Sequence, residues 1–184
     1  MGKKIAIVLF NLGGPDKSED IKPFLRNLFS DKSIIDLPAI FRIPIANIIS
    51  TFRAPKAKPL YDLMGGGSPL LKNTIAQSEA LLNELNSRHI GFEFKIFIAM
   101  RYWHPFIKDV AKEVANFAPD ETILLPLYPH YSMTTTGSSW CEWTKYSKSP
   151  YKLIKEYPVL DGLVSTMAGN ILEEYEKLGK PEKV

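Results

Sequence analysis

Cysteine, histidine and excess charge are all scarce in this sequence. Cys141 is the only cysteine, so the chain can form neither an internal disulfide nor a cysteine-rich metal site. The three histidines show no metal-ligand spacing, and we assign no metal ligand. A formal net charge of +3 without a basic run predicts no nucleic-acid partner. So little cysteine favours a reducing compartment, and we expect a cytoplasmic protein.

Long apolar runs are also missing. The most apolar stretch, residues 37–52, is interrupted by Pro38, Arg42 and Pro44 and is short for a bilayer span, so we expect no transmembrane helix. The sequence does have 45% hydrophobic residues in a chain of 184, which is enough for one compact domain.

Apolar periodicity predicts strands that alternate with helices. The expected strands are Lys4–Phe10, Phe92–Met100, Thr122–Leu127 and Tyr151–Glu156. The expected helices are capped by Asp16 or Ser18, by Ser68 with Pro69 after it, by Ser138 or Ser139, and by Asp161, and a further helix begins at Pro105. The helix from Asp161 is expected to have Leu163, Met167, Ile171 and Tyr175 facing inward. Such alternation is typical of an α/β fold, here a small, flavodoxin-like, doubly wound parallel sheet.

Two segments do not fit this alternation. Residues 31–67 show no long periodic element, and an irregular stretch of that length is usually functional. Residues 179–184 are polar and include Pro181, so we expect a linker or a truncated end there.

Glycines, aromatic residues and hydroxyl residues gather where the predicted strands end. Asn11–Pro15, Arg101–Pro105 and Tyr128–Gly137 each follow a strand, and Arg53–Ser68 ends the irregular stretch. Ligands of doubly wound sheets bind beyond the carboxyl ends of the strands, so we expect a cleft there. Among the histidines, His130 is the one expected to face it.

Most of these features have a second interpretation. Gly13–Gly14 allows close backbone approach to a ligand, or makes an ordinary turn. Gly65–Ser68 can present amides to an anion, as in a phosphate or nucleotide module, or can serve as a flexible joint and helix cap. Arg53 and Lys56 can clamp carboxylates or be solvated surface charges. The hydroxyl run from Ser132 is expected mainly to satisfy loop backbone groups. Trp140, Cys141 and Trp143 are expected to pack.

Five segments, taken together, resemble the ferrochelatase family: NLGGP at 11–15, FRAPKAKPLY at 52–61, GGGSP at 65–69, MRYWHPFI at 100–107 and LYPHYSMTTTGSS at 127–139. The resemblance extends from residue 5 to about residue 175. It implies one of two similar domains with porphyrin bound between them. Residues 1–178 would form a chelatase-like N-terminal domain with a lip insertion at about 31–67, and a C-terminal domain would be missing.

The resemblance also implies a set of porphyrin-binding residues. Arg53 would pair with a propionate with help from Lys56, and residues 37–52 would form an apolar lip that makes peripheral contact with a membrane. The complete set is Leu12, Arg53, Lys56, Tyr61, Ser68, Arg101, Tyr102, Tyr128 and Ser132.

The activity implied is that of a lyase of haem biosynthesis, which inserts Fe²⁺ into protoporphyrin IX to form protohaem. Fe²⁺ is then a substrate, and no tightly bound cofactor is expected. Met133 stands where some relatives have a cluster cysteine, so no iron–sulfur cluster is expected. The family's base, a histidine in Ser-Ala-His-Ser-Leu-Pro, and its supporting glutamate motif do not occur in these 184 residues. We therefore assign no catalytic residue and expect the chain alone to be inactive, or to be a non-catalytic porphyrin-binding domain.

Overall fold

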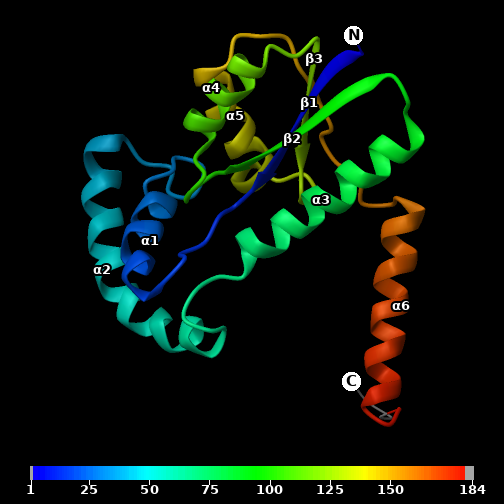
Figure 1. Ribbon diagram of the computed structural model, residues 1–184. Helices are drawn as coiled ribbons and strands as arrows, with labels where there is room; N and C mark the ends of the chain where they lie inside the picture. Colours follow the sequence, from blue (N-terminus) through cyan, green and yellow to red (C-terminus); the bar gives the residue numbers. More distant parts are fainter. Residues whose placement is uncertain (1, 181–184) are drawn as a thin grey trace.

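The computed structural model describes residues 2–180 and contains a four-stranded, all-parallel sheet (Figure 1). The strands are β1 (Lys3–Asn11), β2 (Phe92–Met100), β3 (Glu121–Pro126) and β4 (Lys152–Leu153). Their order is β2-β1-β3-β4, which is the flavodoxin-like arrangement. Part of the predicted linker, residues 181–184, lies outside the described residues.

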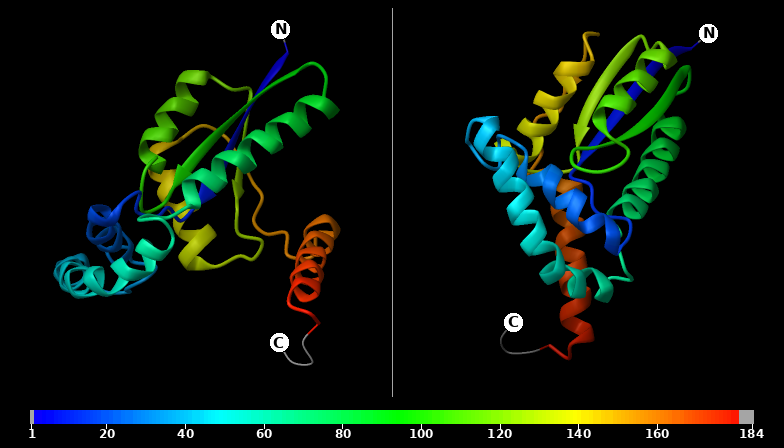
Figure 2. Two further views of the ribbon diagram at one scale, coloured as in Figure 1. Left: turned by 60° about the horizontal axis from the view of Figure 1, so that its bottom comes forward. Right: turned by 90° about the vertical axis from the view of Figure 1, so that its left-hand side faces the viewer.

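Within residues 2–180, six α-helices surround or extend this sheet (Figures 1 and 2). They are α1 (Ile21–Phe29), α2 (Ala39–Leu63), α3 (Leu70–Arg88), α4 (Ile107–Phe117), α5 (Ser138–Tyr146) and α6 (Asp161–Lys177). A short 3₁₀ turn, Ser18–Asp20, precedes α1, and a π-helical turn, Met133–Gly137, precedes α5.

Strand β1 is buried on both faces because it lies inside the sheet. Ala6, Val8 and Phe10 pack with α4 and with Trp143 of α5. On the other face, Ile5, Ile7 and Leu9 pack with Leu81 and Leu85 of α3. Successive side chains of a strand point to opposite faces, so the unbroken apolar run of β1 supplies both layers of core. The predicted doubly wound α/β sheet is confirmed.

Helices α1 and α2 lie side by side beyond the carboxyl end of the sheet (Figure 2). Helix α1 buries Ile21, Phe24 and Leu25, which lie on one helical face. These side chains pack against Tyr102 and Trp103, just after β2. The helical pair is thereby fixed to the edge where the predicted site residues gather.

The prediction that residues 31–67 contain no long element is wrong, because α2 runs for 25 residues. Three prolines lie inside it, Pro44, Pro55 and Pro59, and proline lacks the N–H that a helix interior uses. Only Ala46 and Ser50 of this helix are buried, so the sequence has no apolar periodicity that would predict a helix here. Packing against α1 therefore accounts for a helix that neither its proline content nor its apolar periodicity predicts.

The C-terminal part also differs from expectation. The fourth strand is reduced to Lys152–Leu153. Helix α6 buries none of its residues, and Met167 and Ile171 are 54% and 67% exposed, so the prediction that they face inward is wrong. Figure 1 shows α6 standing away from the sheet. The apolar positions of α6 correctly predict a helix, but they pack against no other element within residues 2–180 closely enough to be buried.

Several of the predicted helix caps do not form. Asp16 accepts a hydrogen bond from the Trp103 indole at 2.9 Å, and Ser18 donates to Asp62 at 3.2 Å, so neither caps α1. Asp161 makes no side-chain cap on α6. The Ser68 hydroxyl does accept from the Leu70 amide at 3.2 Å, as expected at the start of α3.

Candidate functional site

The segments after β1, β2 and β3 are joined by main-chain hydrogen bonds. The pairing of β1 with β2 continues past the strands, because the Arg101 amide donates to Asn11 O and the Tyr102 amide to Leu12 O, both at 2.9 Å. On the other side, the Leu127 amide donates to Phe10 O at 2.9 Å. These bonds place Leu12, Arg101 and Tyr102 together at the carboxyl edge, where the parallel topology predicts a site.

A buried carboxylate, Asp31, collects the polar side chains at this edge. Its Oδ2 accepts from Arg101 Nη2 at 3.0 Å and from the Tyr102 hydroxyl at 2.7 Å, and it also accepts from the Ser138 hydroxyl. Its Oδ1 accepts from the Ser33 amide at 2.8 Å. Arg101 Nε donates to Ser138 at 2.6 Å, which closes the cluster.

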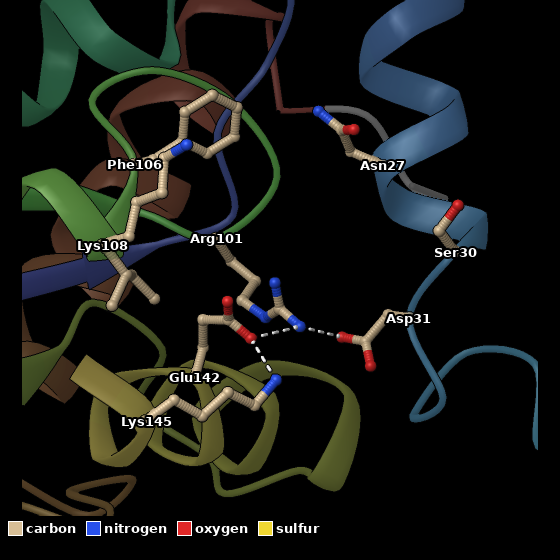
Figure 3. Close-up of a pocket in the computed structure, with 9 residues that line it drawn as sticks. Asn27, Ser30, Asp31, Arg101, Phe106, Lys108, Glu142 and Lys145 are labelled. Atoms are coloured by element: carbon tan, nitrogen blue, oxygen red, sulfur yellow. Dashed lines mark hydrogen bonds and ion pairs between the residues drawn. The ribbon is translucent and has the colours of Figure 1, made fainter. Parts of the chain in front are cut away.

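Arg101 has a second acidic neighbour (Figure 3). Its Nη2 lies 3.4 Å from Glu142 Oε2, and Lys145 of α5 lies 2.7 Å from the same oxygen. Figure 3 shows the guanidinium pointing between Asp31 and Glu142. The row of charges alternates in sign, so each buried charge has an opposite partner, as burial requires.

The environment shifts the ionisation of two members of the cluster. Burial raises the pKa of Asp31, but the hydrogen bonds from Ser138, Tyr102 and the Ser33 amide, with the charge of Arg101, outweigh it and leave the pKa below its ordinary value. Burial, with the Asp31 carboxylate, raises the pKa of the Tyr102 hydroxyl well above its ordinary range. At neutral pH the carboxylate is ionised and the phenol is a proton donor.

A pocket of about 390 Å³ opens beside this cluster (Figure 3). A second hollow of about 470 Å³ shares Asp31, Arg101, Glu142 and Lys145 with it. The first pocket is lined by Asn27, Ser30, Asp31, Arg101, Phe106, Ile107, Lys108, Glu142 and Lys145. The Arg101 ion pairs therefore border both hollows.

The apolar part of the site lies next to the cluster. Leu12 and Tyr61 are partly buried and pack with Tyr102 and Trp103. Burial raises the pKa of the Tyr61 hydroxyl. Ser68 is tied to the turn after β1, because its amide donates to Pro15 O at 2.8 Å. The segment 65–69 thus closes against the first turn of the chain.

The two cations predicted to bind carboxylates, Arg53 and Lys56, lie away from the Asp31 cluster. Arg53 and Lys56 are exposed side chains on α2, and neither lines the pocket of Figure 3. The Arg53 guanidinium lies over the Phe29 ring at 5.6 Å, a cation–π contact that directs it toward α1. The structure brings Arg101 and Tyr102 into one cluster and leaves these two cations on the outer helix.

Tyr128 and Ser132 follow β3. The Tyr128 hydroxyl is buried with no hydrogen-bond partner, and burial, followed by the nearby Tyr102, raises its pKa. Ser132 accepts from the Thr134 amide at 3.2 Å, so it satisfies loop backbone as the sequence predicts. His130 is exposed and lines none of the described pockets, contrary to expectation. Trp143 is fully buried as predicted, whereas Cys141 is exposed.

Sequence reasoning missed Asp31, Ser138 as its partner, and Glu142. Asp31 sits in the stretch predicted to be irregular, and Arg101 and Ser138 lie 70 and 107 residues further along the chain. No local pattern links them. Among residues 2–180, no three His, Cys, Asp or Glu side chains are grouped so as to hold a metal ion. Within the same residues, no helix has the length and apolar character needed to cross a membrane.

Comparison with known proteins decides the family. A family model described as "Ferrochelatase" matches residues 4–184. The chain belongs to the ferrochelatase family. The ferrochelatase of Phenylobacterium zucineum is 52% identical over 183 residues, covering 98% of this chain and 53% of the relative. That of Caulobacter vibrioides is 50% identical over 186 residues, covering all of this chain and 54% of the relative. A ferrochelatase of Wolbachia pipientis is 45% identical over 189 residues, covering 97% and 59%.

This member of the ferrochelatase family spans about half the length of the curated relatives it matches. Its four parallel strands with helices on both faces are consistent with one ferrochelatase domain.

Proposed function

We propose that this chain is the N-terminal, porphyrin-binding half of a ferrochelatase, an enzyme of haem biosynthesis that inserts Fe²⁺ into protoporphyrin IX. The domain covers residues 1–178, with residues 31–67 as a lip. One observation carries the proposal: a family match over residues 4–184 coincides with Leu12, Arg101 and Tyr102 joined at one sheet edge. Fe²⁺ is a substrate here, and the two pyrrole protons leave the macrocycle as the metal enters.

The geometry suits the holding of a large, flat, apolar dianion. Leu12 and Tyr61 pack against the apolar cluster that contains Trp103, beyond β1 and β2, and in our proposal this cluster supplies the apolar wall. Such a wall can bind a porphyrin in a bent form, so that part of the binding energy is used for strain. Arg53 and Lys56 are exposed on α2, where they can reach propionates at the rim of the ring.

The polar end of the site is built around Arg101 and Tyr102, with Tyr128 and Ser132 as the neighbouring wall. Tyr102 is a protonated phenol at neutral pH, because burial and Asp31 raise its pKa. Its single O–H proton is donated to Asp31, and the phenol cannot accept the pyrrole protons by ionising beforehand. The base belongs in our proposal to a C-terminal domain, which carries the family's histidine motif and completes the enzyme.

The first experiment tests the clamp in the full-length enzyme. Arg53→Ala and Tyr61→Phe are expected to weaken porphyrin binding by about tenfold each, since each loses one charged or hydroxyl contact worth ~1–2 kcal/mol. Arg88→Ala is the matched control, because Arg88 is an exposed arginine on α3 that pairs only with Glu84. Wild-type affinity and turnover in both clamp variants would remove Arg53 and Tyr61 from the site.

The second experiment separates binding from metal insertion. Titration of the 184-residue chain with protoporphyrin IX should shift the porphyrin absorption, and addition of Fe²⁺ should yield no protohaem. Protohaem formed by this chain alone would show that the proton acceptor lies within it. Absence of porphyrin binding would contradict the proposal itself.

The structure disfavours a phosphate-binding role for Gly65–Ser68. The Ser68 amide is already bonded to Pro15 O, and its hydroxyl to the Leu70 amide. A Cβ at Gly67 would collide with Asp16 O, so the loop is packed against the first turn. Few of its donors remain free to bind an anion.

A further inference from the structure

We propose that Asp31 is a positioning residue, which holds Arg101 and Tyr102 in one orientation at the carboxyl edge of the sheet. The inference rests on the proposed function, because it assigns those two side chains to the porphyrin pocket. Asp31 itself is 8% exposed and would act only through its neighbours.

The orientation of the Asp31 carboxylate is itself set by a hydrogen bond from a nearby backbone amide. The Ser33 amide donates to Oδ1 at 2.8 Å, a short-range bond that sets the plane of the carboxylate at the end of α1. The other oxygen, Oδ2, is then presented to Arg101, Tyr102 and Ser138. Three donors from two distant segments meet on one acceptor atom.

The two side chains that Asp31 holds are consecutive in the sequence. Neighbouring residues of an extended strand point to opposite faces, so both can reach one carboxylate only where the strand geometry has ended. The segment 101–105 is bent in this structure. The Arg101 guanidinium also lies over the Tyr102 ring at 4.9 Å, so displacement of either side chain disturbs the other.

Within residues 2–180, no other acidic side chain contacts both Arg101 and Tyr102. Glu142 lies further from Arg101, at 3.4 Å, and is shared with Lys145. The remaining partner of the Tyr102 hydroxyl is Ser138, at 3.3 Å. Without the carboxylate, Arg101 keeps its weaker ion pair and Tyr102 keeps a longer hydrogen bond. Both side chains then gain rotational freedom.

The test reads the orientation of Arg101 directly, without porphyrin. In the 184-residue chain, the Arg101 Nε–H group donates to Ser138 and should exchange slowly with solvent in NMR spectra. Its signal is assigned by its loss in Arg101→Lys. We expect Asp31→Asn to accelerate this exchange, and Asp31→Glu to accelerate it less, because the longer side chain keeps the charge but displaces the carboxylate. Asp109→Asn is the control, because Asp109 is a partly exposed carboxylate on α4 whose only ion pair among the described residues is with Lys112.

Porphyrin affinity supplies the second readout. Asp31→Asn should raise the dissociation constant for protoporphyrin about tenfold, the loss usual when a residue that orients a ligand-contacting side chain is removed. The control should stay at the wild-type value. If the wild-type chain binds no porphyrin, the proposed function fails while the NMR result still decides the positioning role.

Two outcomes would overturn the inference. One is an Asp31→Asn chain, folded at the temperature of measurement, whose Arg101 signal exchanges at the wild-type rate. If Asp31→Asn does not fold, Asp31→Glu decides instead. It keeps the charge but moves the carboxylate by one methylene, and it is expected to shift the Arg101 signal. An unshifted signal together with unchanged porphyrin affinity would contradict a positioning role.

Discussion

Gly14 and Ser68 are in direct contact: a Cβ built on Gly14 would lie 2.5 Å from both Cβ and Oγ of Ser68. The same turn is bonded through the backbone, since the Ser68 amide donates to Pro15 O. The turn after β1 and the turn before α3 therefore form one packed unit, and Gly14 is required for its close approach.

Gly14→Ala should separate these two turns. Overpacking of this kind costs ~1–3 kcal/mol, so the free energy of unfolding in urea should fall by that amount. Gly169→Ala is the matched control, because a Cβ there meets nothing within 4 Å and lies inside helix α6. The control should keep or raise helix content. Equal stability of the two variants would contradict the contact.

Removal of the Asp31 carboxylate should make the free energy of unfolding less dependent on pH in the acid range. The pKa of Asp31 is lowered in the folded state, so its contribution is present above the unfolded value of 3.8 and is lost as pH falls through the folded value. Wild-type stability should therefore fall steeply as the pH drops below about 4. Urea unfolding of Asp31→Asn between pH 2 and 6 should show a shallower dependence. A parallel pair of curves would rule the linkage out.

Helix α6 should exchange its amide hydrogens sooner than any helix packed on the sheet. It buries no residue, whereas α4 buries Ile107, Val110, Ala111 and Val114. Helices in proteins owe most of their stability to a packed face, so α6 opens locally at low cost. Hydrogen–deuterium exchange with mass spectrometry on the 184-residue chain measures both helices in one experiment. Protection of α6 equal to that of α4 would mean that it is covered in solution.

Trp143 should be the costliest single aromatic residue to truncate. It is fully buried against Phe10, with ring centroids 6.0 Å apart. Trp143→Ala should lower the free energy of unfolding by ~3–5 kcal/mol. Its indole N–H has no partner in the core, so Trp143→Phe loses packing volume but no hydrogen bond and should cost clearly less. Denaturant titration of the two variants gives the comparison, and equal losses would contradict the packing argument.

The outer side of α2 should bind anionic vesicles. Phe41 and Ile48 are 60% and 58% exposed, and Arg53 and Lys56 are exposed on the same helix. Apolar side chains beside basic ones suit a peripheral membrane contact. Phe41→Ser with Ile48→Ser should reduce co-sedimentation with vesicles that contain an anionic lipid. Ile90→Ser is the control, since Ile90 is 94% exposed but lies in a distant turn. An equal loss in the control would remove α2 as the contact.

The sheet was predictable because its signals are local. Residues 5–10 are a continuous apolar run and residues 92–100 are mostly apolar, and the structure has strands at Lys3–Asn11 and Phe92–Met100. Helix α2 was not predictable, since Pro44, Pro55 and Pro59 inside it argue against a helix and its packing partner, α1, is not evident from the sequence. The apolar periodicity of α6 correctly predicts a helix. The buried face that it also predicts would need a packing surface that residues 2–180 do not provide.

The polar cluster was only half predictable. Arg101 and Tyr102 follow a strand, so topology alone puts them at the edge of the sheet. Asp31 has no such mark, because it belongs to the end of a helix and its importance arises from partners far along the chain. Ser138 was predicted to be a cap, and its hydroxyl instead bonds to Asp31. Only the folded chain shows which hydroxyl meets which acid.

The distance along the chain between Asp31 and Ser138 also sets an order of events during synthesis. At about 5–20 residues per second, the 107 residues that separate them take roughly 5–20 s to emerge from the ribosome. Until Arg101 and Tyr102 have emerged, the α1–α2 pair cannot dock without burying a carboxylate that lacks most of its partners, which is unfavourable. The pair is therefore expected to dock only after β2 has appeared, and the set of Asp31 partners is complete only when Ser138 follows.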